Sequence, residues 1–511
     1  MLLIHPPVVK PCEPPAGIAK LCGALSSHGI AVDVLDANLE GLLSLLRNPA
    51  PTSPDTWTRR ASRHLTRHLD SLKERKTYQH GDRYKRAVSD VNRVLEQMAF
   101  PLGVHLSLAN YQHPELSPTR SADLIRAAER PEENLFYPCF RKRLLELTED
   151  RKSSLVGLSL NYLSQALCAF AIIGFLKKEV PGLPLVLGGG LVTSWMRRPG
   201  WMNPFKGLVD HLVAGPGEEP LLSVLGVERG GKGQATCQHD APDYAPFPLD
   251  DYLSPGGVLP YSASSGCYWN KCSFCPERAE GSPYIPIPGK KVIGDLQGLI
   301  QRHQPALVHL VDNAISPALL KVISENPLGV PWYGFARMTH PLTGPDFCIA
   351  LKQSGCVMLK LGLESGDQGV LDQMQKGISL EEASAVLKSV KKAGIATYVY
   401  LLFGTPPEGE EEARKTLEFV VSHHEDIDFL NVAIFNLPVY GPDTRKLDTR
   451  VFNEGDLSLY VDFEHPKGWN RKKVRQFLDK EFGRHPAIAE ILRRDPPVFT
   501  SNHAPFFVMS R

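Results

Sequence analysis

Short apolar segments of strand length alternate with helical segments along two separate stretches of the chain. In the first stretch the strand-like segments lie at residues 2–4, 31–36, 155–160, 185–187 and 209–214. Strands that alternate with helices pair in parallel, because each helix carries the chain back across the sheet. The first stretch therefore predicts an α/β domain built on a doubly wound parallel sheet. Ligands of such sheets bind at the carboxyl ends of the strands, where the turns carry the glycines Gly188, Gly189, Gly215 and Gly217.

The second stretch repeats the alternation six times. Its strand-like segments lie at residues 258–262, 306–312, 331–337, 357–364, 397–404 and 429–437. Six strand–helix units predict a partial parallel barrel, which again carries its chemistry at the carboxyl ends of its strands. The predicted organisation is an α/β domain at 1–228 with a helical insertion at about 45–151, a linker at 229–256, the barrel at 257–440 and an extension at 441–511.

Composition narrows the class of protein. The chain has 511 residues, of which 42% are hydrophobic and 22% charged, so two or three ordinary domains are expected. Lysine and arginine number 57 against 56 acidic residues, a formal net charge of +1 that gives no support for a nucleic-acid partner. No apolar run reaches the ~18 residues of a membrane span. The first residues lack the features of a signal peptide. The chain has ten cysteines, three clustered and seven scattered, which is not the pattern of a disulfide framework. A cytoplasmic protein with reduced thiols is expected.

Three of the cysteines are clustered. Cys267, Cys272 and Cys275 lie within nine residues, with no fourth cysteine or histidine nearby. Thiolates are soft ligands that suit zinc or iron–sulfur clusters. A closed zinc site needs four protein ligands, whereas three cysteines on a cubane cluster leave one iron free to bind another molecule. The alternative is a structural zinc site that borrows Cys237 or His239.

Polar side chains and a glycine turn end the other predicted barrel strands. These residues are Asp312 and Asn313 at the end of the second strand, Arg337 at the end of the third, Glu364 and Ser365 at the end of the fourth, and the turn from Gly404 to Glu408 at the end of the fifth. Each could singly be a cap or turn residue. Because the carboxyl ends of barrel strands share one face, we expect these residues to lie close to the cysteine loop.

The cysteine run resembles the signature of the radical S-adenosylmethionine (SAM) superfamily, including the aromatic Phe274 before the third cysteine. The resemblance implies a [4Fe-4S] cluster whose free iron chelates the amino and carboxylate groups of SAM. In that superfamily the reduced cluster cleaves SAM to methionine and a 5′-deoxyadenosyl radical. The chain departs from the usual spacing, because four residues instead of three separate Cys267 from Cys272. We interpret this as a longer cluster loop.

The resemblance extends over residues 255–440 and implies SAM contacts. It places Asp312 and Asn313 at the SAM amino group, although the usual Gly-Gly-Glu is absent. Glu364 and Ser365 match the ribose motif, and Gly404 matches the turn that passes adenine. Arg337 could pair bidentately with the SAM carboxylate.

Residues 1–45 and 150–225 resemble the cobalamin-binding half that precedes many radical SAM proteins. The residues that carry this resemblance are Pro6, Pro7, Ser159, Gly188, Gly189 and the turn from Gly215 to Pro220. By resemblance, Ser159, Gly188, Gly189, Gly215, Gly217 and Glu218 would surround the nucleotide tail and edge of the corrin. A side chain at Gly189 would then occupy space that the cofactor needs. The alternative is a sheet that has lost its cofactor or that binds a nucleotide.

A short motif beginning at Asp36 looks like the Asp-x-His-x-x-Gly sequence of other cobalamin proteins. Asn38 stands at the histidine position, and the motif follows the second strand instead of the first. We therefore assign no histidine ligand to cobalt and expect base-off cobalamin.

The insertion and the extension carry weaker signals. His64 and His68 are one helical turn apart, but neighbouring basic residues favour a solvated helix face over a metal site. The aromatic residues of the extension indicate packing, or alternatively a lid that faces the substrate. His503 is the one residue there that we would test for proton transfer.

Together these features predict a cobalamin-dependent radical SAM enzyme. By resemblance, the expected reaction is methyl transfer to an unactivated carbon or a phosphinate phosphorus of a small molecule or peptide. An electron donor such as flavodoxin or ferredoxin is the expected partner. Ring contraction or cyclisation, and a non-catalytic corrinoid or cluster carrier, are the alternatives.

Overall fold

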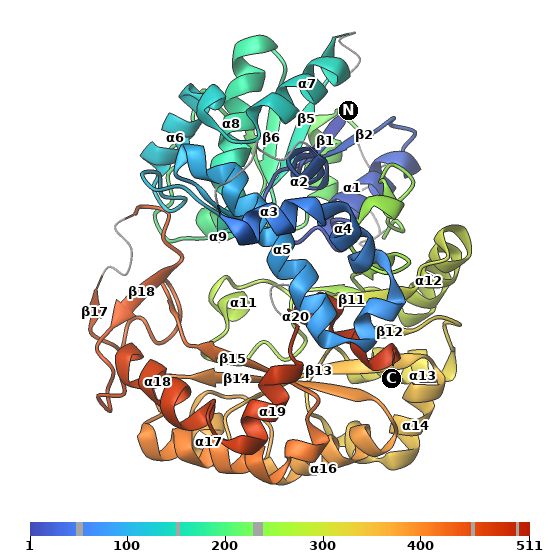
Figure 1. Cartoon of the computed structure of the whole chain (residues 1–511), viewed down its shortest axis with the longest axis vertical. Helices are drawn as coiled ribbons and strands as arrows, with labels where there is room; N and C mark the ends of the chain where they lie inside the picture. The colour runs from blue at the N-terminus through green and yellow to red at the C-terminus, as the bar shows by residue number, and fades with distance from the viewer. Residues whose placement is uncertain (48–54, 150–153, 228–238, 451–454, 497–499, 511) are drawn as a thin grey trace. The chain divides into compact units, whose positions relative to one another are not determined.

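The computed structural model describes residues 1–47, 55–149, 154–227, 239–450, 455–496 and 500–510 (Figure 1). The chain divides into two compact units. The first unit comprises Met1–Gly257 and Asn453–Leu459, and the second comprises Val258–Phe452 and Tyr460–Arg511. None of the described helices is long and apolar enough to cross a membrane.

The first unit contains a five-stranded sheet in which every pair of neighbours is parallel. The strands are β1 (Leu2–His5), β2 (Asp33–Asp36), β5 (Val156–Ser159), β6 (Leu185–Gly188) and β7 (His211–Leu212). Their order, β2-β1-β5-β6-β7, reverses between β1 and β5. This reversal is the switch point of a doubly wound sheet, beside which such sheets bind ligands. The predicted fold class is confirmed for this unit.

Helices follow the strands, as predicted, and one of them is buried on almost every side. The helices that connect the strands are α1 (Ala16–Ser27), α2 (Ala37–Arg47), α8 (Leu163–Glu179), α9 (Gly190–Met196) and α10 (Glu218–Val224). Helix α8 packs against α6 (Ser121–Glu129) of the insertion, and a Cβ on Gly174 would lie 1.8 Å from the Ala128 carbonyl oxygen. Because α8 is covered by the insertion, its sequence is apolar throughout instead of amphipathic.

The insertion is mainly helical, as predicted, and it also contains a β-hairpin that the sequence analysis did not predict. Its further elements are α3 (Thr56–Arg63), α4 (Leu65–Lys73), α5 (Gly81–Ala99), β3 (His105–Ser107), β4 (Asn110–Gln112) and α7 (Tyr137–Thr148). His64 separates α3 from α4, and His68 Nε2 lies 3.1 Å from the buried carboxylate of Asp90 on α5. His68 therefore faces a neighbouring helix and not the solvent.

The second unit contains a six-stranded parallel sheet whose strands follow one another in chain order. The strands are β8 (Val258–Tyr261), β11 (Leu307–Ile315), β12 (Trp332–Ala336), β13 (Cys356–Glu364), β14 (Ala396–Phe403) and β15 (Phe429–Ile434). The connecting helices include α12 (Gly289–His303), α13 (Pro317–Glu325), α14 (Pro345–Gln353), α16 (Leu380–Lys392) and α17 (Glu410–Ser422). Helices α13, α14, α16 and α17 lie along one side of the sheet (Figure 1). The predicted partial barrel is confirmed.

The other side of this sheet forms the barrel interior, and it contains a buried lysine. Lys360 Nζ lies 4.8 Å from the ring centroids of both Tyr333 and Phe335, and 3.3 Å from His309 Nε2. Aromatic faces attract an ammonium group, so the rings help to offset the cost of burying its charge.

The extension after β15 forms a small sheet and several helices. Its elements are β16 (Leu437–Pro438), β17 (Thr449–Arg450), β18 (Tyr460–Phe463), α18 (Arg471–Phe477), a π-helical turn (Leu478–Phe482), α19 (Pro486–Arg494) and α20 (Thr500–Met509). Phe477 and Phe482 pack against Phe403 of β14, with ring centroids 6.0 and 5.3 Å away. His503 is fully buried, and its suggested role in proton transfer stays a prediction.

Candidate functional site

The three clustered cysteines lie on the loop that follows β8. Short strands β9 (Ser264–Ser265) and β10 (Ile285–Pro286) pair antiparallel and close the two ends of this loop. Gly266 begins the loop at φ +72°, and a Cβ there would lie only 2.4 Å from the Pro283 carbonyl oxygen. Only glycine fits such an approach at this φ. The loop, which we call the cluster loop (residues 266–278), ends in α11 (Pro276–Ala279).

The thiols of the cluster loop influence one another and sit close to two cationic side chains. Burial is the main cause that raises the pKa of Cys275 to about 11; the nearby Cys272 and Cys267 contribute to the rise, and backbone hydrogen bonds from residues 277 and 278 oppose it. Burial also raises the pKa of Cys272, while the charges of Lys376 and Arg337 oppose that rise. Three thiols on one loop, one of them beside two cations, fit an anionic iron–sulfur cluster, whose irons would displace the thiol protons.

The described residues contain no group of three histidine, cysteine or acidic side chains that could hold a single metal ion. Each thiolate of a cubane cluster binds a different iron, so the three cysteines need not converge on one point. Cys237, the cysteine proposed for a zinc alternative, lies outside the described residues, and His239 belongs to the first unit.

Asp312 and Asn313 are adjacent near the end of β11, but their environments differ. Asp312 is only 2% exposed, and its carboxylate accepts hydrogen bonds from the Ala263 amide, at 3.0 Å, and from the Ser264 hydroxyl. The side chain therefore holds the chain just before the cluster loop, which differs from the expected contact with the SAM amino group. Asn313 is exposed. Adjacent strand residues point to opposite faces, so only Asn313 of this pair remains available to a ligand.

Arg337 follows β12 and contacts the cluster loop directly. Its guanidinium carbon lies 4.3 Å from the ring centroid of Trp269, and Nη1 lies 3.9 Å from Cys272 Sγ. Nη2 donates to the Lys376 carbonyl oxygen. The buried Nε has no hydrogen-bond partner. Arg337 is thus placed beside the cysteines as predicted, with one buried donor left for a ligand.

Glu364 and Ser365 at the end of β13 also differ from each other. Glu364 adopts φ +71°, and its carboxylate accepts a hydrogen bond from Lys376 Nζ at 2.8 Å. Gly362 leaves room for this ion pair, because a Cβ there would lie 2.6 Å from Glu364 Oε1. Ser365 is fully buried, and its hydroxyl accepts the Asp367 amide proton at 3.1 Å. Only Glu364 of the predicted ribose pair is placed to meet a ligand.

Residues 374–377, which we call the clamp segment, were not identified from the sequence. The segment follows α15 (Gln368–Gln373) and receives hydrogen bonds from the Ser273 amide at 2.9 Å and from the Trp269 indole at 3.0 Å. Arg278 Nη1 donates to the Gln375 side chain at 3.0 Å. The segment thereby fixes the cluster loop at several points. The sequence offers no periodicity or spacing that would reveal it.

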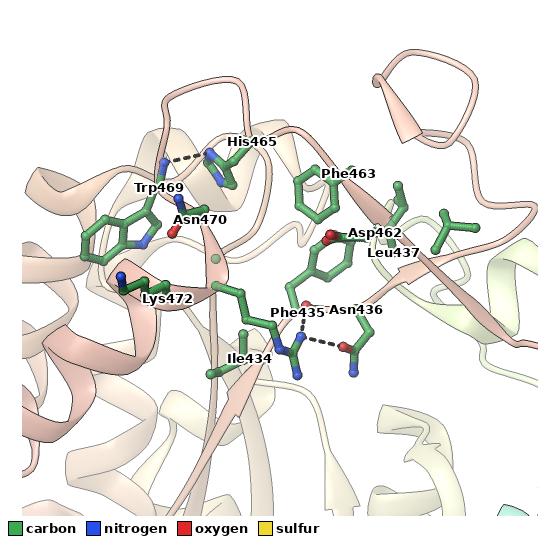
Figure 2. Close-up of a pocket in the computed structure, with 13 residues that line it drawn as sticks. Ile434, Phe435, Asn436, Leu437, Asp462, Phe463, His465, Trp469, Asn470 and Lys472 are labelled. Carbon is green, nitrogen blue, oxygen red and sulfur yellow. Dashed lines mark hydrogen bonds between the residues drawn. The ribbon is translucent and has the colours of Figure 1, made fainter. Parts of the chain in front are cut away.

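Gly404 ends β14 at φ +79° and lines a cavity of about 240 Å³ (Figure 2). The other lining residues come from the end of β15 and from the extension, and they are Ile434, Phe435, Asn436, Leu437, Val461, Asp462, Phe463, His465, Trp469, Asn470, Arg471 and Lys472. Arg471 Nη1 donates to Asn436 Oδ1 at 2.7 Å and to the Phe435 carbonyl oxygen at 3.3 Å. The extension therefore forms one wall of a pocket at the carboxyl ends of β14 and β15.

Glu408 connects the turn after β14 to the extension. It is fully buried, and its Oε2 accepts hydrogen bonds from the Gly404 amide and, at 3.2 Å, from Trp469 Nε1. Burial raises the pKa of Glu408 to about 8. At neutral pH the carboxyl group is mostly protonated. The role of this residue was not expected from the sequence.

The residues proposed to contact cobalamin lie along the carboxyl edge of the first sheet. Ser159 ends β5 and accepts a hydrogen bond from Asn161 Nδ2 at 3.1 Å. Gly189 follows β6 at φ +109°, and a Cβ there would lie 2.4 Å from the Leu160 carbonyl oxygen. The close neighbour of this glycine within the first unit is the main chain after β5, and its contact with cobalamin stays a prediction.

The remaining predicted residues of this edge have partners within the first unit. A Cβ on Gly188 would make ordinary contact with Val213 at 3.5 Å, and one on Gly217 would lie 3.2 Å from Leu21 Cδ2. The Gly215 amide donates to Thr193 Oγ1 at 2.9 Å. Glu218 pairs with Lys20 at 2.6 Å. The Glu218 carboxylate therefore links α10 to α1.

Asn38 has a structural role that agrees with its exclusion as a cobalt ligand. Its side chain accepts from the Val9 amide and donates to the Val9 carbonyl oxygen, both at 2.9 Å. Asp36 accepts a hydrogen bond from the Tyr252 hydroxyl at 2.6 Å. Both side chains are thus committed to holding loops of the first unit.

Comparison with known proteins identifies the family of the barrel. Residues 261–420 match the family model described as the radical SAM superfamily. The chain is 25% identical over 276 residues to the uncharacterized methyltransferase PH0819 of Pyrococcus horikoshii, covering 50% of this chain and 57% of that relative. It is 23% identical over 373 residues to the anaerobic magnesium-protoporphyrin IX monomethyl ester cyclase of Rubrivivax gelatinosus, covering 62% and 65%. The chain thus spans between half and two thirds of the length of these curated relatives.

One solved structure shares the fold of both units. The radical SAM methyltransferase TsrM of Kitasatospora setae, with cobalamin and a [4Fe-4S] cluster bound, superposes with a TM-score of 0.52 at 16% identity, covering 87% of this chain and 77% of TsrM. At this identity the likeness concerns the fold. Residues 261–420 thus match the radical SAM superfamily, and the parallel sheets of both units have the fold that TsrM shares.

Proposed function

We propose that the protein is a cobalamin-dependent radical SAM methyltransferase. The observation that carries the proposal is the loop of three cysteines at the carboxyl end of the barrel, where Arg337 lies beside Cys272 and the Lys376–Glu364 ion pair lies near the loop. A bound cluster would supply the electron that cleaves SAM, and cobalamin would carry the methyl group. The chain's own residues would bind and orient these cofactors and exclude water.

On the barrel side, Cys267, Cys272 and Cys275 would each bind one iron and leave the fourth for the amino acid end of SAM. The buried Nε of Arg337 is a donor for the SAM carboxylate, since a guanidinium matches a carboxylate in geometry and charge. Glu364 would accept hydrogen bonds from the ribose hydroxyls.

The other end of SAM is proposed to lie toward Gly404. Phe274 is proposed to contact the same cofactor, and Lys376 Nζ lies 5.7 Å from its ring centroid. The cavity beside Gly404 is lined by aromatic side chains such as Phe435 together with many polar groups, which could stack on and hydrogen-bond to a nucleoside.

On the first unit, cobalamin is proposed to bind at the carboxyl edge of the sheet beside the β1–β5 switch point. Ser159, Gly188 and Gly215 lie on that edge, and the glycines leave main chain accessible there. The cobalamin described in the TsrM structure supports this proposal. We propose that no histidine of this unit replaces the lower ligand of cobalt, because Asn38 is committed to the Val9 main chain.

The proposed reaction is methyl transfer to an unactivated carbon or to phosphorus of a small molecule or peptide. The methyltransferase relative supports this reaction class. Cyclisation without net methyl transfer is the second candidate, favoured by the likeness to a magnesium-protoporphyrin ester cyclase. A flavodoxin or ferredoxin is the proposed electron donor.

The test begins with anaerobic reconstitution of the full chain. The wild type should bind about four irons, cleave SAM when reduced, and bind cobalamin at micromolar concentration. A variant with Cys267, Cys272 and Cys275 all changed to Ala should lose iron and SAM cleavage. Cys348→Ala, which removes a buried thiol of the same unit remote in sequence from the cluster loop, is the matched control and should keep both.

Methyl-labelled SAM separates the two candidate reactions. A methyltransferase should move the label into the corrinoid fraction before any substrate is added, whereas a cyclase should cleave SAM without that transfer. A wild-type protein with stoichiometric zinc and no iron would contradict the whole proposal.

A further inference from the structure

The Lys376 ammonium group lies near the cluster loop and pairs with Glu364, the residue proposed to bind the ribose of SAM. Its side chain is 6% exposed, and its Nζ donates to Glu364 Oε1 at 2.8 Å. The same ammonium group lies 5.7 Å from the ring centroid of Phe274, the residue directly before the third cysteine. The lysine thus stands between β13 and the cluster loop.

The main chain of Lys376 is fixed as firmly as its side chain. Its carbonyl oxygen accepts from Arg337 Nη2, whose Nη1 lies 3.9 Å from Cys272 Sγ. Its neighbour Gly377 packs on the Trp269 ring, because a Cβ at Gly377 would lie 2.0 Å from Trp269 Cζ2. The clamp segment therefore cannot move without moving the cluster loop, so the ammonium group keeps a fixed place beside the cysteines.

A fixed positive charge distinguishes the oxidation states of an iron–sulfur cluster. Three thiolates on an oxidised cubane core give a net negative charge, and one added electron increases it. A nearby ammonium group in a poorly solvated site stabilises the more negative state more strongly.

We propose that Lys376 is a positioning residue that favours the reduced cluster and holds the Glu364 carboxylate in place for the SAM ribose. This inference rests on the proposed function. In the reduction step one electron passes from a one-electron donor protein to the cluster, and no bond in Lys376 forms or breaks. The lysine acts on the cluster through its charge, and it acts on Glu364 by holding the carboxylate in position.

The test compares Lys376→Met, which keeps the length of the side chain without its charge, with Lys376→Arg, which keeps the charge. Each reconstituted protein is titrated with a reductant while the reduced cluster is followed by electron paramagnetic resonance. The methionine variant should have a midpoint potential more negative than the wild type, and the arginine variant should lie nearer to the wild type. SAM should bind at least tenfold more weakly to Lys376→Met, because Glu364 loses its partner.

The matched control is Lys321→Met, which removes a charge from an exposed position on α13. Its potential and SAM affinity should equal those of the wild type. An unchanged potential and unchanged SAM affinity in Lys376→Met would overturn the inference while leaving the proposed function intact. A wild type without a cluster would instead overturn the proposed function.

Loss of the cluster from the variants is also informative. If Lys376→Met loses iron and Lys376→Arg retains it, the charge itself holds the anionic cluster and the inference stands. If both lose iron with wild-type secondary structure, the side chain acts only through packing and the inference fails.

Discussion

Substitution of Gly377 tests the contact between the clamp segment and the cluster loop. Gly377 has φ +66°, and a Cβ there would lie 2.0 Å from Trp269 Cζ2 and 2.5 Å from Cη2. Alanine therefore forces the indole to move. The indole cannot move freely, because its Nε1 donates to the Gln375 carbonyl oxygen and the Arg337 guanidinium lies on its ring.

The expected cost has two parts. A left-handed backbone costs an L-residue roughly 1–2 kcal/mol, and overpacking of a fitted contact costs about 1–3 kcal/mol. The chain offers a control for the first part. Gly281 also has φ +66°, but nothing lies within 4 Å of the position of its Cβ. Gly377→Ala should therefore be less stable than Gly281→Ala by the overpacking part alone, about 1–3 kcal/mol.

The assay is thermal unfolding of both apoproteins, followed by iron content after reconstitution. In a domain of this size 1 kcal/mol corresponds to roughly 2–4 °C in Tm, so Gly377→Ala should melt about 2–12 °C below Gly281→Ala. Displacement of Trp269 should also lower the iron content of Gly377→Ala. Equal Tm and equal iron content in the two variants would show that Gly377 does not support the cluster loop.

Two further predictions concern Glu408 and the edge of the first sheet. Because the pKa of Glu408 is raised to about 8 in the folded protein, its contribution to stability should be fully present below its ordinary pKa of 4.5 and be lost as the pH rises toward 8. Glu408→Gln, which resembles the protonated acid, should flatten the dependence of Tm on pH between 5 and 8, and parallel curves for the two proteins would contradict the assignment. Gly189→Ala should lower the Tm of the apoprotein because its Cβ would meet Leu160, whereas Gly190→Ala, whose nearest neighbour is Asn161 Oδ1 at 3.7 Å, should not. Gly188→Ala, whose Cβ would make only ordinary contact with Val213 at 3.5 Å, should weaken cobalamin binding without unfolding the protein, and unchanged cobalamin affinity would exclude Gly188 from the proposed edge.

The architecture of both units could be predicted from the sequence because it depends on hydrophobic periodicity. The six barrel strands appear in chain order at nearly the predicted residues, and the sheet of the first unit has the expected parallel pairing. The β3–β4 hairpin was not predicted, since strands of three residues leave too short an alternation to recognise. The burial of Lys360 and Glu408 could not be predicted from the sequence either, because charged residues in strands and turns are usually exposed.

Only those residues of the candidate site that lie at the ends of strands could be predicted from the sequence. Arg337 and Glu364 were predicted to lie near the cysteine loop because they stand at the carboxyl ends of barrel strands. Asp312 and Asn313 were both assigned to the SAM amino group, although neighbouring residues of a strand point to opposite faces. In the structure the Asp312 carboxylate accepts a hydrogen bond from the Ala263 amide, just before the cluster loop. Lys376 lies twelve residues beyond its partner Glu364 in a segment without periodicity, so its position depends on tertiary packing.

The unusual spacing of the first two cysteines has a structural explanation in the clamp segment. Four residues separate Cys267 from Cys272, and among them Asn270 adopts φ +44°, a left-handed conformation that asparagine tolerates better than most residues. Beside it, Trp269 is held by the Gln375 carbonyl oxygen, the Arg337 guanidinium and the backbone of Gly377. The longer spacing thus carries an aromatic anchor that packs against Arg337 after β12 and against the clamp segment after α15. Because that anchor is fixed by the barrel, the cysteines are positioned by contacts outside their own loop, and spacing alone is a poor guide to whether such a loop can hold a cluster.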